Sequence, residues 1–402
     1  MPPVQVKAGI HWIGVNDRTT DLFEGLWPIT SEGVSYNSYL IRSDKIALVD
    51  LAKAAHEGSF FDQLAQLVDP TELDYVVMNH MEPDHTGSLR VLKHLAPKAE
   101  FVVSPKAKPM LEAYYGITDR IRVVEDGESI SLGAHELEFY QIPFVHWPET
   151  MVTYETSQRV LFSCDAFGGY GALRGAIFDD ECKDPAFYQA EALRYYVNIV
   201  AKYSRPTLMA IDKLGGLDID VIAPSHGLVW RSDPARIVEL YRAWAGYASS
   251  AGDPGITVVY GSMYGHTEAM MNAVAEGASS SGLAVSIYDA ARTDVSYVLP
   301  SLWTKRGVLI GAPTYEGNLF PPAAEVMRMA GTKRIQRRLV GYFGSYGWSG
   351  GARKECAAIA EDIKWRWWDA LEFQGSASRQ ALKEGEAFGR RFAAAVAEDA
   401  DD

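Results

Sequence analysis

The chain has 402 residues, of which 48% are hydrophobic and 22% are charged, and its formal net charge is −14. This length exceeds one ordinary hydrophobic core and predicts two domains. The negative charge argues against a nucleic-acid partner, whose phosphates require clusters of Lys and Arg. No apolar run approaches the ~20 residues that a membrane-spanning helix needs.

The cysteines indicate the compartment. Cys164, Cys182 and Cys356 lie far apart, and an odd number of separated cysteines suits a reducing cytoplasm better than a disulfide framework. The first residues lack the basic-then-apolar layout of a secretory signal. No CxxC pair occurs, which argues against a cysteine-ligated iron module in this chain. We therefore expect a cytoplasmic protein.

Residues 1–250, the predicted first domain, alternate between β-rich runs and amphipathic segments. The runs that predict strands are YNSYLIRS, KIALVDLA, LDYVVMN, EFVVSP, HELEFYQIP, MVTYET, RVLFSCD and DVIAPSHG. Helical patterns cover residues 58–68, 88–95 and 105–115. We expect Ser104 to cap the last of these, with Pro105 at its first position. A closing helix is predicted in SDPARIVELYRAWAGYA, with Ser232 or Asp233 as its cap and Pro234 in its first turn.

The small and turn-forming residues of SSAGDPG, residues 249–255, mark the predicted domain boundary. In residues 255–402 a regular alternation of strands and helices follows. Its predicted strands are ITVVYGS, AVSIYDA, RGVLIGA, RLVGYFGS and DALEFQGS. Five parallel strands alternating with helices are typical of a doubly wound α/β sheet.

Metal-binding side chains gather at the ends of predicted strands in the first domain. The stretch VVMNHMEPDHTGS carries four of them: His80, Glu82, Asp84 and His85. Alternate side chains of an extended segment share a face, so His80 and Glu82 can reach one metal. Asp84 and His85 come where a helix starts and can hold a second metal. Later strand ends add three more candidates: His146, Asp165 and His226. A carboxylate such as Asp165 can bridge two cations.

Three loops rich in glycine and hydroxyl groups follow predicted strands of the second domain. In SMYGHT, the backbone N–H groups and the hydroxyls of Ser262 and Thr267 can receive a phosphate at a helix N-terminus. This stretch resembles the flavodoxin phosphate loop, with His266 where flavodoxins usually have Asn. GAPTYEGNLFP and FGSYGWSGGA suit close backbone approach to a flat ring, although ordinary glycine-rich turns are the alternative. The candidate FMN contacts are Ser262, Met263, Tyr264, Gly265, His266, Thr267, Pro313, Thr314, Tyr315, Glu316, Gly317, Asn318, Ser345, Tyr346, Gly347, Trp348, Ser349 and Gly350.

The order H-x-E-x-D-H…H…D…H resembles the metal signature of the metallo-β-lactamase fold. Glu82 stands where the hydrolases usually carry a second histidine, and its hard oxygen donor favours an iron pair over zinc. The whole chain is similar to the flavodiiron proteins, a family of O₂ and nitric oxide reductases. The resemblance implies an α/β fold: a metallo-β-lactamase-like αββα sandwich followed by a flavodoxin-like doubly wound parallel sheet.

The resemblance also implies the two cofactors, a non-haem pair of iron ions and FMN. One iron would be bound by His80, Glu82 and His146, and the other by Asp84, His85 and His226, with Asp165 as the bridge. In some members the histidine at the position of His85 turns away from the iron, so the resemblance allows both arrangements of His85.

As a member of this family the chain would reduce O₂ to water, with reduction of NO to N₂O as a second activity of the same centre. Electrons would come through FMN from a separate donor such as rubredoxin, in a head-to-tail homodimer or a dimer of dimers. Some relatives have a histidine where this chain has Glu24, and we expect O₂ to be the preferred substrate.

Two other functions remain as alternatives. A zinc hydrolase of the metallo-β-lactamase fold could carry the flavodoxin-like part as an appended module. A simple electron carrier would leave the seven metal-binding residues unexplained. Trp147 and Trp348 adjoin the proposed sites and either line the gap between flavin and irons or pack at a domain face.

Overall fold

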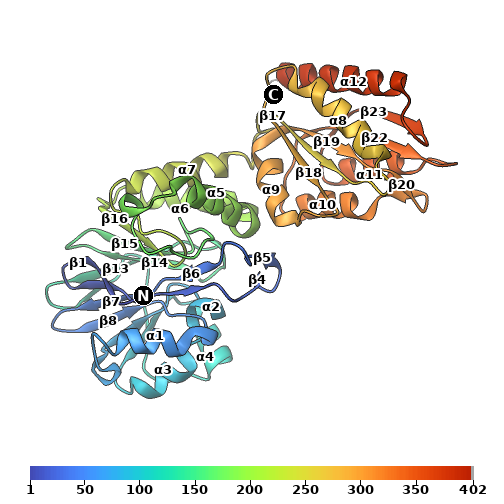
Figure 1. The fold of residues 1–402 in the computed structure, drawn as a ribbon. Helices are drawn as coiled ribbons and strands as arrows, with labels where there is room; N and C mark the ends of the chain where they lie inside the picture. Colours follow the sequence, from blue (N-terminus) through green and yellow to red (C-terminus); the bar gives the residue numbers. More distant parts are fainter. Residues whose placement is uncertain (400–402) are drawn as a thin grey trace. The chain divides into compact units, whose positions relative to one another are not determined.

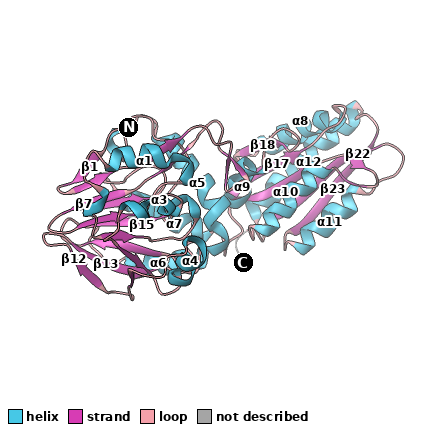
Figure 2. Cartoon of the chain, turned by 90° about the horizontal axis from the view of Figure 1, so that it is seen from below, coloured by secondary structure: helices cyan, strands magenta, loops and turns pink. Residues whose placement is uncertain are grey.

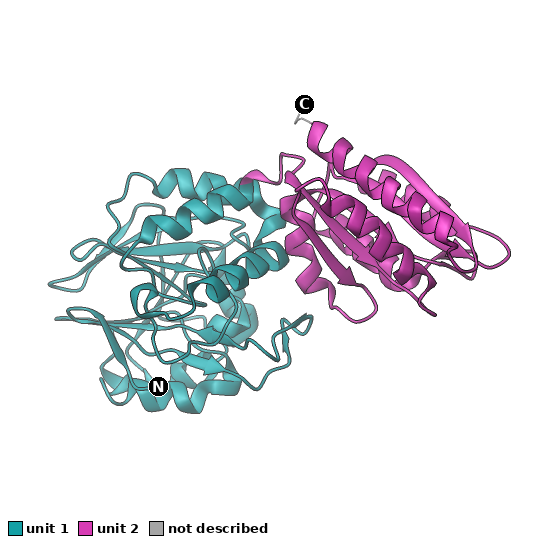
Figure 3. Cartoon of the chain, turned by 45° about the horizontal axis from the view of Figure 1, so that its top comes forward, with its two compact units in different colours: residues 1–245 teal, residues 246–402 magenta. Residues whose placement is uncertain are grey.

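The computed structural model describes residues 1–399, so the last three residues of the predicted second domain lie outside the described residues. The chain divides into two compact units, residues 1–245 and residues 246–402 (Figure 3). In the described part of the chain, no helix combines the length and the apolar character needed to cross a membrane.

The predicted domain boundary, residues 249–255, belongs to unit 2. Arg337 and Arg338 donate hydrogen bonds to the backbone carbonyls of Ser249 and Ser250, at 2.7 and 3.0 Å. The division into units therefore falls a few residues earlier, between Ala245 and Gly246.

Unit 1 is an αββα sandwich (Figure 1). Within the described residues its larger sheet has seven strands, in the spatial order β1 (Val4–Lys7), β2 (Ile10–Trp12), β7 (Tyr39–Arg42), β8 (Ile46–Val49), β9 (Tyr75–Val77), β10 (Glu100–Val103) and β11 (Ile121–Val123). The other sheet has the order β12 (Ser129–Ser131), β13 (Glu136–Gln141), β14 (Met151–Glu155), β15 (Val160–Cys164) and β16 (Val221–Pro224). Strands β14 and β15 are buried throughout, as expected for strands covered on both faces.

Helices cover the outer face of each sheet of unit 1. In Figure 1 the larger sheet is covered by α1 (Glu57–Leu64), α3 (Leu89–Leu95) and α4 (Ala107–Tyr115). The other sheet is covered by α5 (Pro185–Tyr195), α6 (Ser204–Leu214) and α7 (Pro234–Gly246). Two short hairpins pair β3 (Val15–Asp17) with β6 (Val34–Tyr36) and β4 (Leu22–Phe23) with β5 (Trp27–Pro28).

Every strand run predicted in this unit contains an observed strand, and one helix starts later than predicted. Helix α4 begins at Ala107, two residues after the predicted start at Pro105. The Ser104 hydroxyl accepts the backbone N–H of Ala107 at 3.3 Å, as expected of a cap, and donates to the backbone carbonyl of Glu149 at 2.6 Å. The closing helix begins at Pro234 as predicted, and Asp233 accepts from the backbone N–H of Arg236.

Unit 2 is a doubly wound sheet whose neighbouring strands all run parallel. Its spatial order is β18 (Val285–Asp289), β17 (Asp253–Tyr260), β19 (Lys305–Gly311), β22 (Leu339–Tyr346) and β23 (Arg366–Gln374). Helices α8 (His266–Ser279) and α12 (Arg379–Glu398) cover one face (Figure 1). The other face carries α9 (Val295–Thr304), α10 (Pro321–Thr332) and α11 (Ala352–Asp362), which can be followed in Figure 2. This is the flavodoxin-like strand order.

Candidate metal centre and flavin loops

The strand ends of unit 1 supply the predicted metal-binding side chains. Strand β9 leads directly to His80, and Glu82 is the N-cap of the short helix α2 (Pro83–Thr86) that carries Asp84 and His85. The remaining three residues follow strands of the other sheet: His146 comes after β13, Asp165 after β15 and His226 after β16. We call these seven residues the candidate metal centre.

The carboxylate of Asp165 lies between the four histidines. Its Oδ2 atom is 3.4 Å from Nε2 of His80 and 3.3 Å from Nε2 of His146. Its Oδ1 atom is 2.9 Å from Nε2 of His85 and 3.3 Å from Nε2 of His226. Each oxygen of Asp165 thus faces its own pair of imidazoles, which is the geometry of a bridging carboxylate.

A second carboxylate completes each half of the centre. Glu82 Oε2 is 3.2 Å from Nε2 of both His80 and His146. The oxygens of Asp84 lie 3.4 Å from Nε2 of His85 and 3.4 Å from Nε2 of His226. We name the halves the His80 position (His80, Glu82, His146) and the His85 position (Asp84, His85, His226). Each has two imidazoles and one carboxylate and shares Asp165.

The buried atoms of the centre lack ordinary hydrogen bonds. Among the described residues, neither carboxylate oxygen of Asp84 or of Asp165 has a hydrogen-bond partner. The same holds for both ring nitrogens of His85 and for Nε2 of His226. Buried polar atoms are nearly always satisfied, and metal coordination is one way to satisfy them. These carboxylates and imidazoles therefore fit a pair of cations.

The charges of the centre need compensation. Burial lowers the pKa of His226, but the carboxylates of Asp165 and Asp84, 3.3 and 3.4 Å from its Nε2 atom, outweigh burial and raise the pKa to about 10. The same balance raises the pKa of His146 to about 9. Burial raises the pKa of Asp165, yet the surrounding histidines hold it well below its ordinary value. Protons on the imidazoles balance the carboxylates when no cation is present, and bound metal ions replace them.

Two histidines are oriented by the ring nitrogen that faces away from the centre. His80 Nδ1 donates to Glu149 Oε1 at 2.8 Å, and His226 Nδ1 donates to the backbone carbonyl of Ser35 at 2.7 Å. These bonds fix the tautomer that turns Nε2 toward the centre. The sequence prediction missed Glu149, although a carboxylate three residues after His146 in HWPET was a usable signal.

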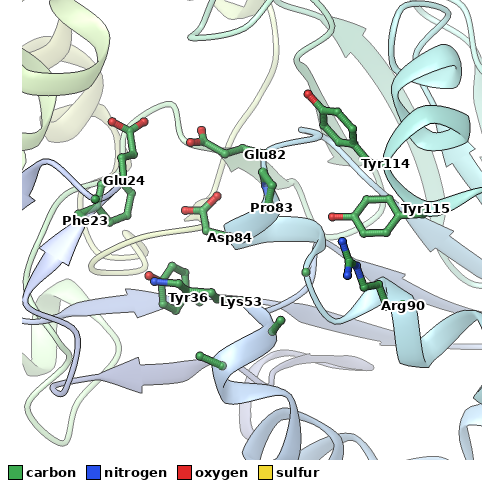
Figure 4. A pocket seen from close by; sticks show the side chains of 14 residues that line it. Phe23, Glu24, Tyr36, Lys53, Glu82, Pro83, Asp84, Arg90, Tyr114 and Tyr115 are labelled. Carbon is green, nitrogen blue, oxygen red and sulfur yellow. The ribbon is translucent and has the colours of Figure 1, made fainter.

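A pocket of about 660 Å³ opens beside the centre. Figure 4 shows Glu24, Glu82 and Asp84 at one side of it and Tyr114 and Tyr115 at the other. Glu24 keeps part of its surface exposed, and the partial burial of its carboxyl together with the negative charge of Glu82 raises its pKa to about 7. The structure places Glu24 on the pocket wall.

Aromatic rings surround the histidines. Phe23 and Tyr36 pack edge-on against His226, with ring centroids 5.4 and 5.5 Å away. Trp147 contacts His80 in the same way at 5.0 Å and is half-buried, so it packs against the candidate metal centre. Trp348, in unit 2, is 92% exposed.

The three predicted flavin loops lie at the carboxyl ends of adjacent strands in unit 2. They follow β17, β19 and β22, which are neighbours in the sheet, and this edge is where open α/β sheets bind ligands. The Ser262 hydroxyl accepts the backbone N–H of Gly265, the left-handed residue (φ 86°) that caps α8. A helix N-terminus leaves its first backbone N–H groups without intrahelical acceptors, and the phosphate site at the start of α8 stays a prediction.

The second and third loops meet each other. Residues 314–319 form the hairpin β20 (Thr314–Tyr315) and β21 (Asn318–Leu319). A Cβ added to Gly351 would lie 1.9 Å from the carbonyl oxygen of Gly317, so only glycine permits this approach. Thr267 and Ser345, whose hydroxyls are 3.2 Å apart, connect the first and third loops. The exposed large hydrophobic side chains on the loops are Met263, Tyr264, Tyr315 and Trp348.

Comparisons with known proteins agree with this architecture. Residues 34–227 match the family described as ODP family beta lactamase, and residues 258–387 match Flavodoxin. A nitric oxide reductase from Moorella thermoacetica is 35% identical over 355 residues, which cover 88% of each chain. An anaerobic nitric oxide reductase flavorubredoxin from Escherichia coli K12 is 33% identical over 396 residues, 97% of this chain and 82% of the relative.

Two solved structures superpose over nearly the whole chain. The flavodiiron protein from Giardia intestinalis has a TM-score of 0.93 and 26% identity, and covers 99% of this chain and 97% of its own. Rubredoxin oxygen:oxidoreductase from Desulfovibrio gigas has a TM-score of 0.92 and 27% identity, with 98% of each chain covered. The chain therefore belongs to the flavodiiron proteins, oxidoreductases whose cofactors are a non-haem diiron centre and FMN.

Proposed function

We propose that this chain reduces O₂ to water at a diiron centre held by its seven clustered residues, with electrons that pass through FMN from a separate donor such as rubredoxin. The observation that carries the proposal is the division of the centre by Asp165, whose two oxygens face two equivalent sets of ligands. The Glu82 carboxylate gives the His80 position a hard oxygen donor, which favours iron over zinc.

In this proposal the residues of the His80 position would hold one iron, those of the His85 position would hold the other, and Asp165 would contribute to both. When bound, the iron pair supplies two electrons and reduced FMN supplies two more, which together meet the demand of O₂ reduction to two waters. The buried Phe23 and Tyr36 rings pack against His226 and form part of the wall of the pocket beside the centre.

FMN would lie on the three loops of unit 2. Its phosphate would bind at the N-terminus of α8 beside Ser262 and Thr267, and its ring would lie among Tyr315, Tyr346 and Trp348. Close spacing of flavin and irons is needed for electron transfer, and a head-to-tail homodimer, alone or as a dimer of dimers, would supply it. The predicted cytoplasmic location is compatible with the three cysteines, all of which are free.

Nitric oxide is the second candidate substrate, because the relatives from Moorella thermoacetica and Escherichia coli are nitric oxide reductases. The zinc-hydrolase alternative lacks such support, since these relatives match along most of the chain. An electron carrier without catalysis leaves the candidate metal centre without a use.

The proposal is tested by parallel O₂ and NO consumption assays on iron- and FMN-loaded protein, with a reduced rubredoxin as the donor. We expect steady consumption of both gases, with the faster rate for O₂. A faster rate for NO would reverse the proposed preference. Absence of consumption of either gas by fully loaded protein would contradict the function itself.

A further inference from the structure

We propose that the two metal positions differ in affinity, and that Glu149 is the positioning residue that makes the His80 position the tighter one. This inference deepens the proposed function and rests on its assignment of the seven ligands. It predicts ordered loading, in which the His80 position fills first and the His85 position fills last.

The residues that would contact the metal ions directly do not explain a difference in affinity between the two positions. Each position offers two histidine Nε2 atoms and one carboxylate, and the two share Asp165. The donor types and the formal charge are therefore equal. Any difference in affinity must arise from the groups that hold these ligands in place.

Glu149 gives the His80 position a charged outer partner. Its carboxylate is fully buried and accepts both His80 Nδ1 at 2.8 Å and the backbone N–H of Met81 at 3.0 Å. The Ser104 hydroxyl binds the backbone carbonyl of the same residue at 2.6 Å, which fixes this part of the loop. A carboxylate that accepts the outer N–H of a metal-binding imidazole orients the ring and increases its basicity.

The His85 position has weaker outer partners. His226 Nδ1 donates to a neutral acceptor, the carbonyl of Ser35. His85 Nδ1 is buried and, among the described residues, has no hydrogen-bond partner. Hydrogen bonds to an ionised acceptor are roughly twice as strong as those between neutral groups. His146 Nδ1, like His85 Nδ1, has no hydrogen-bond partner among the described residues, so each position has one imidazole with an outer partner. That partner is a carboxylate at the His80 position and a neutral carbonyl at the His85 position, so the metal of the His85 position should be released first.

The chain offers a matched control for a buried carboxylate that orients a histidine. Glu155 is also fully buried and accepts His135 Nδ1 at 3.0 Å, but this pair does not belong to the candidate metal centre. Glu149→Gln and Glu155→Gln each replace a charged acceptor of histidine with a neutral one. Only the first is expected to alter metal binding.

The experiment titrates chelator-treated, full-length protein with Co²⁺ under anaerobic conditions, followed by visible absorbance and by competition with a chelating dye. We expect the wild type to bind two Co²⁺ ions in separate steps. Glu149→Gln should weaken the tighter step by roughly 10- to 100-fold and leave the other step unchanged. Glu155→Gln should reproduce both wild-type steps. Asp84→Asn should lose the weaker step and keep the tighter one.

Equal wild-type affinities, an unaltered tighter step in Glu149→Gln, or the same weakening in Glu155→Gln would each overturn the inference. Should Glu149→Gln fail to fold, Asp84→Asn decides: loss of its tighter step overturns the inference, and retention supports it. Uptake of fewer than two Co²⁺ ions by the wild type would instead contradict the proposed function. The two failures are therefore distinguishable.

Discussion

Asp165 is the residue on which both halves of the candidate metal centre depend. Because each of its oxygens faces a different pair of histidines, Asp165→Ala should lower the iron content of both positions and abolish nearly all O₂ consumption. Elemental analysis and an oxygen electrode measure the two effects. Asp218→Ala, at an exposed aspartate paired with Arg159, is the control and should match the wild type. Full iron content and normal turnover in Asp165→Ala would contradict the assignment.

Asp17 links the stability of unit 1 to pH. Burial raises its pKa, but hydrogen bonds from Thr20, His56 and Thr19 outweigh burial and hold the pKa below the ordinary value of 3.8. The folded state therefore prefers the ionised carboxylate, so its stabilisation is present above about pH 4 and is lost as the pH falls further.

Urea unfolding at a series of pH values tests this linkage. Asp17→Asn should lower the free energy of unfolding at neutral pH, and its stability should fall less steeply than that of the wild type below about pH 4. If the two proteins lose stability in parallel over this range, Asp17 does not provide the linkage.

At the scale of elements, the features that could be predicted from the sequence are those that depend on local pattern. Alternating and buried β-rich runs located the strands, and the polar residues after them located the seven candidate ligands. Glu149 was not assigned to the centre, because its role depends on a contact between segments far apart in the chain. Helix α4 starts at Ala107, two residues later than predicted, although the Ser104 hydroxyl caps this end as expected.

Helices α8 and α12 pack through glycines that leave no room for a side chain. A Cβ on Gly389 would lie 2.0 Å from the carbonyl oxygen of Val274. Gly389→Ala should therefore destabilise unit 2 by about 1–3 kcal/mol, measured as a lower midpoint for the release of FMN fluorescence on heating. Lys383→Ala, at an exposed position of the same helix α12, is the control and should leave the midpoint unchanged. Equal effects of the two substitutions would exclude helix contact as the cause.

At the scale of the whole molecule, the proposed head-to-tail dimer predicts complementation between inactive variants. Asp165→Ala lacks a metal centre, and Ser262→Glu places a negative charge in the phosphate site of FMN. In a mixed dimer, the flavin of the first protomer would face the irons of the second. Co-expression should restore up to roughly a quarter of wild-type activity, since half of the random dimers would hold one working pair.

Separately purified variants mixed without subunit exchange are the control and should stay inactive. If co-expressed variants that form mixed dimers show no O₂ consumption, electrons do not pass between protomers, and transfer within one chain replaces the proposed route.

The most direct test of the central claim is a single-turnover titration of fully reduced, iron- and FMN-loaded protein with O₂. The iron signal is followed by Mössbauer spectroscopy, the flavin by its absorbance, and hydrogen peroxide by a coupled assay. If two irons and one FMN act together, one O₂ per protomer should oxidise both cofactors without release of peroxide. Oxidation of the flavin alone, with peroxide formed equally by wild type and Asp165→Ala, would contradict the account.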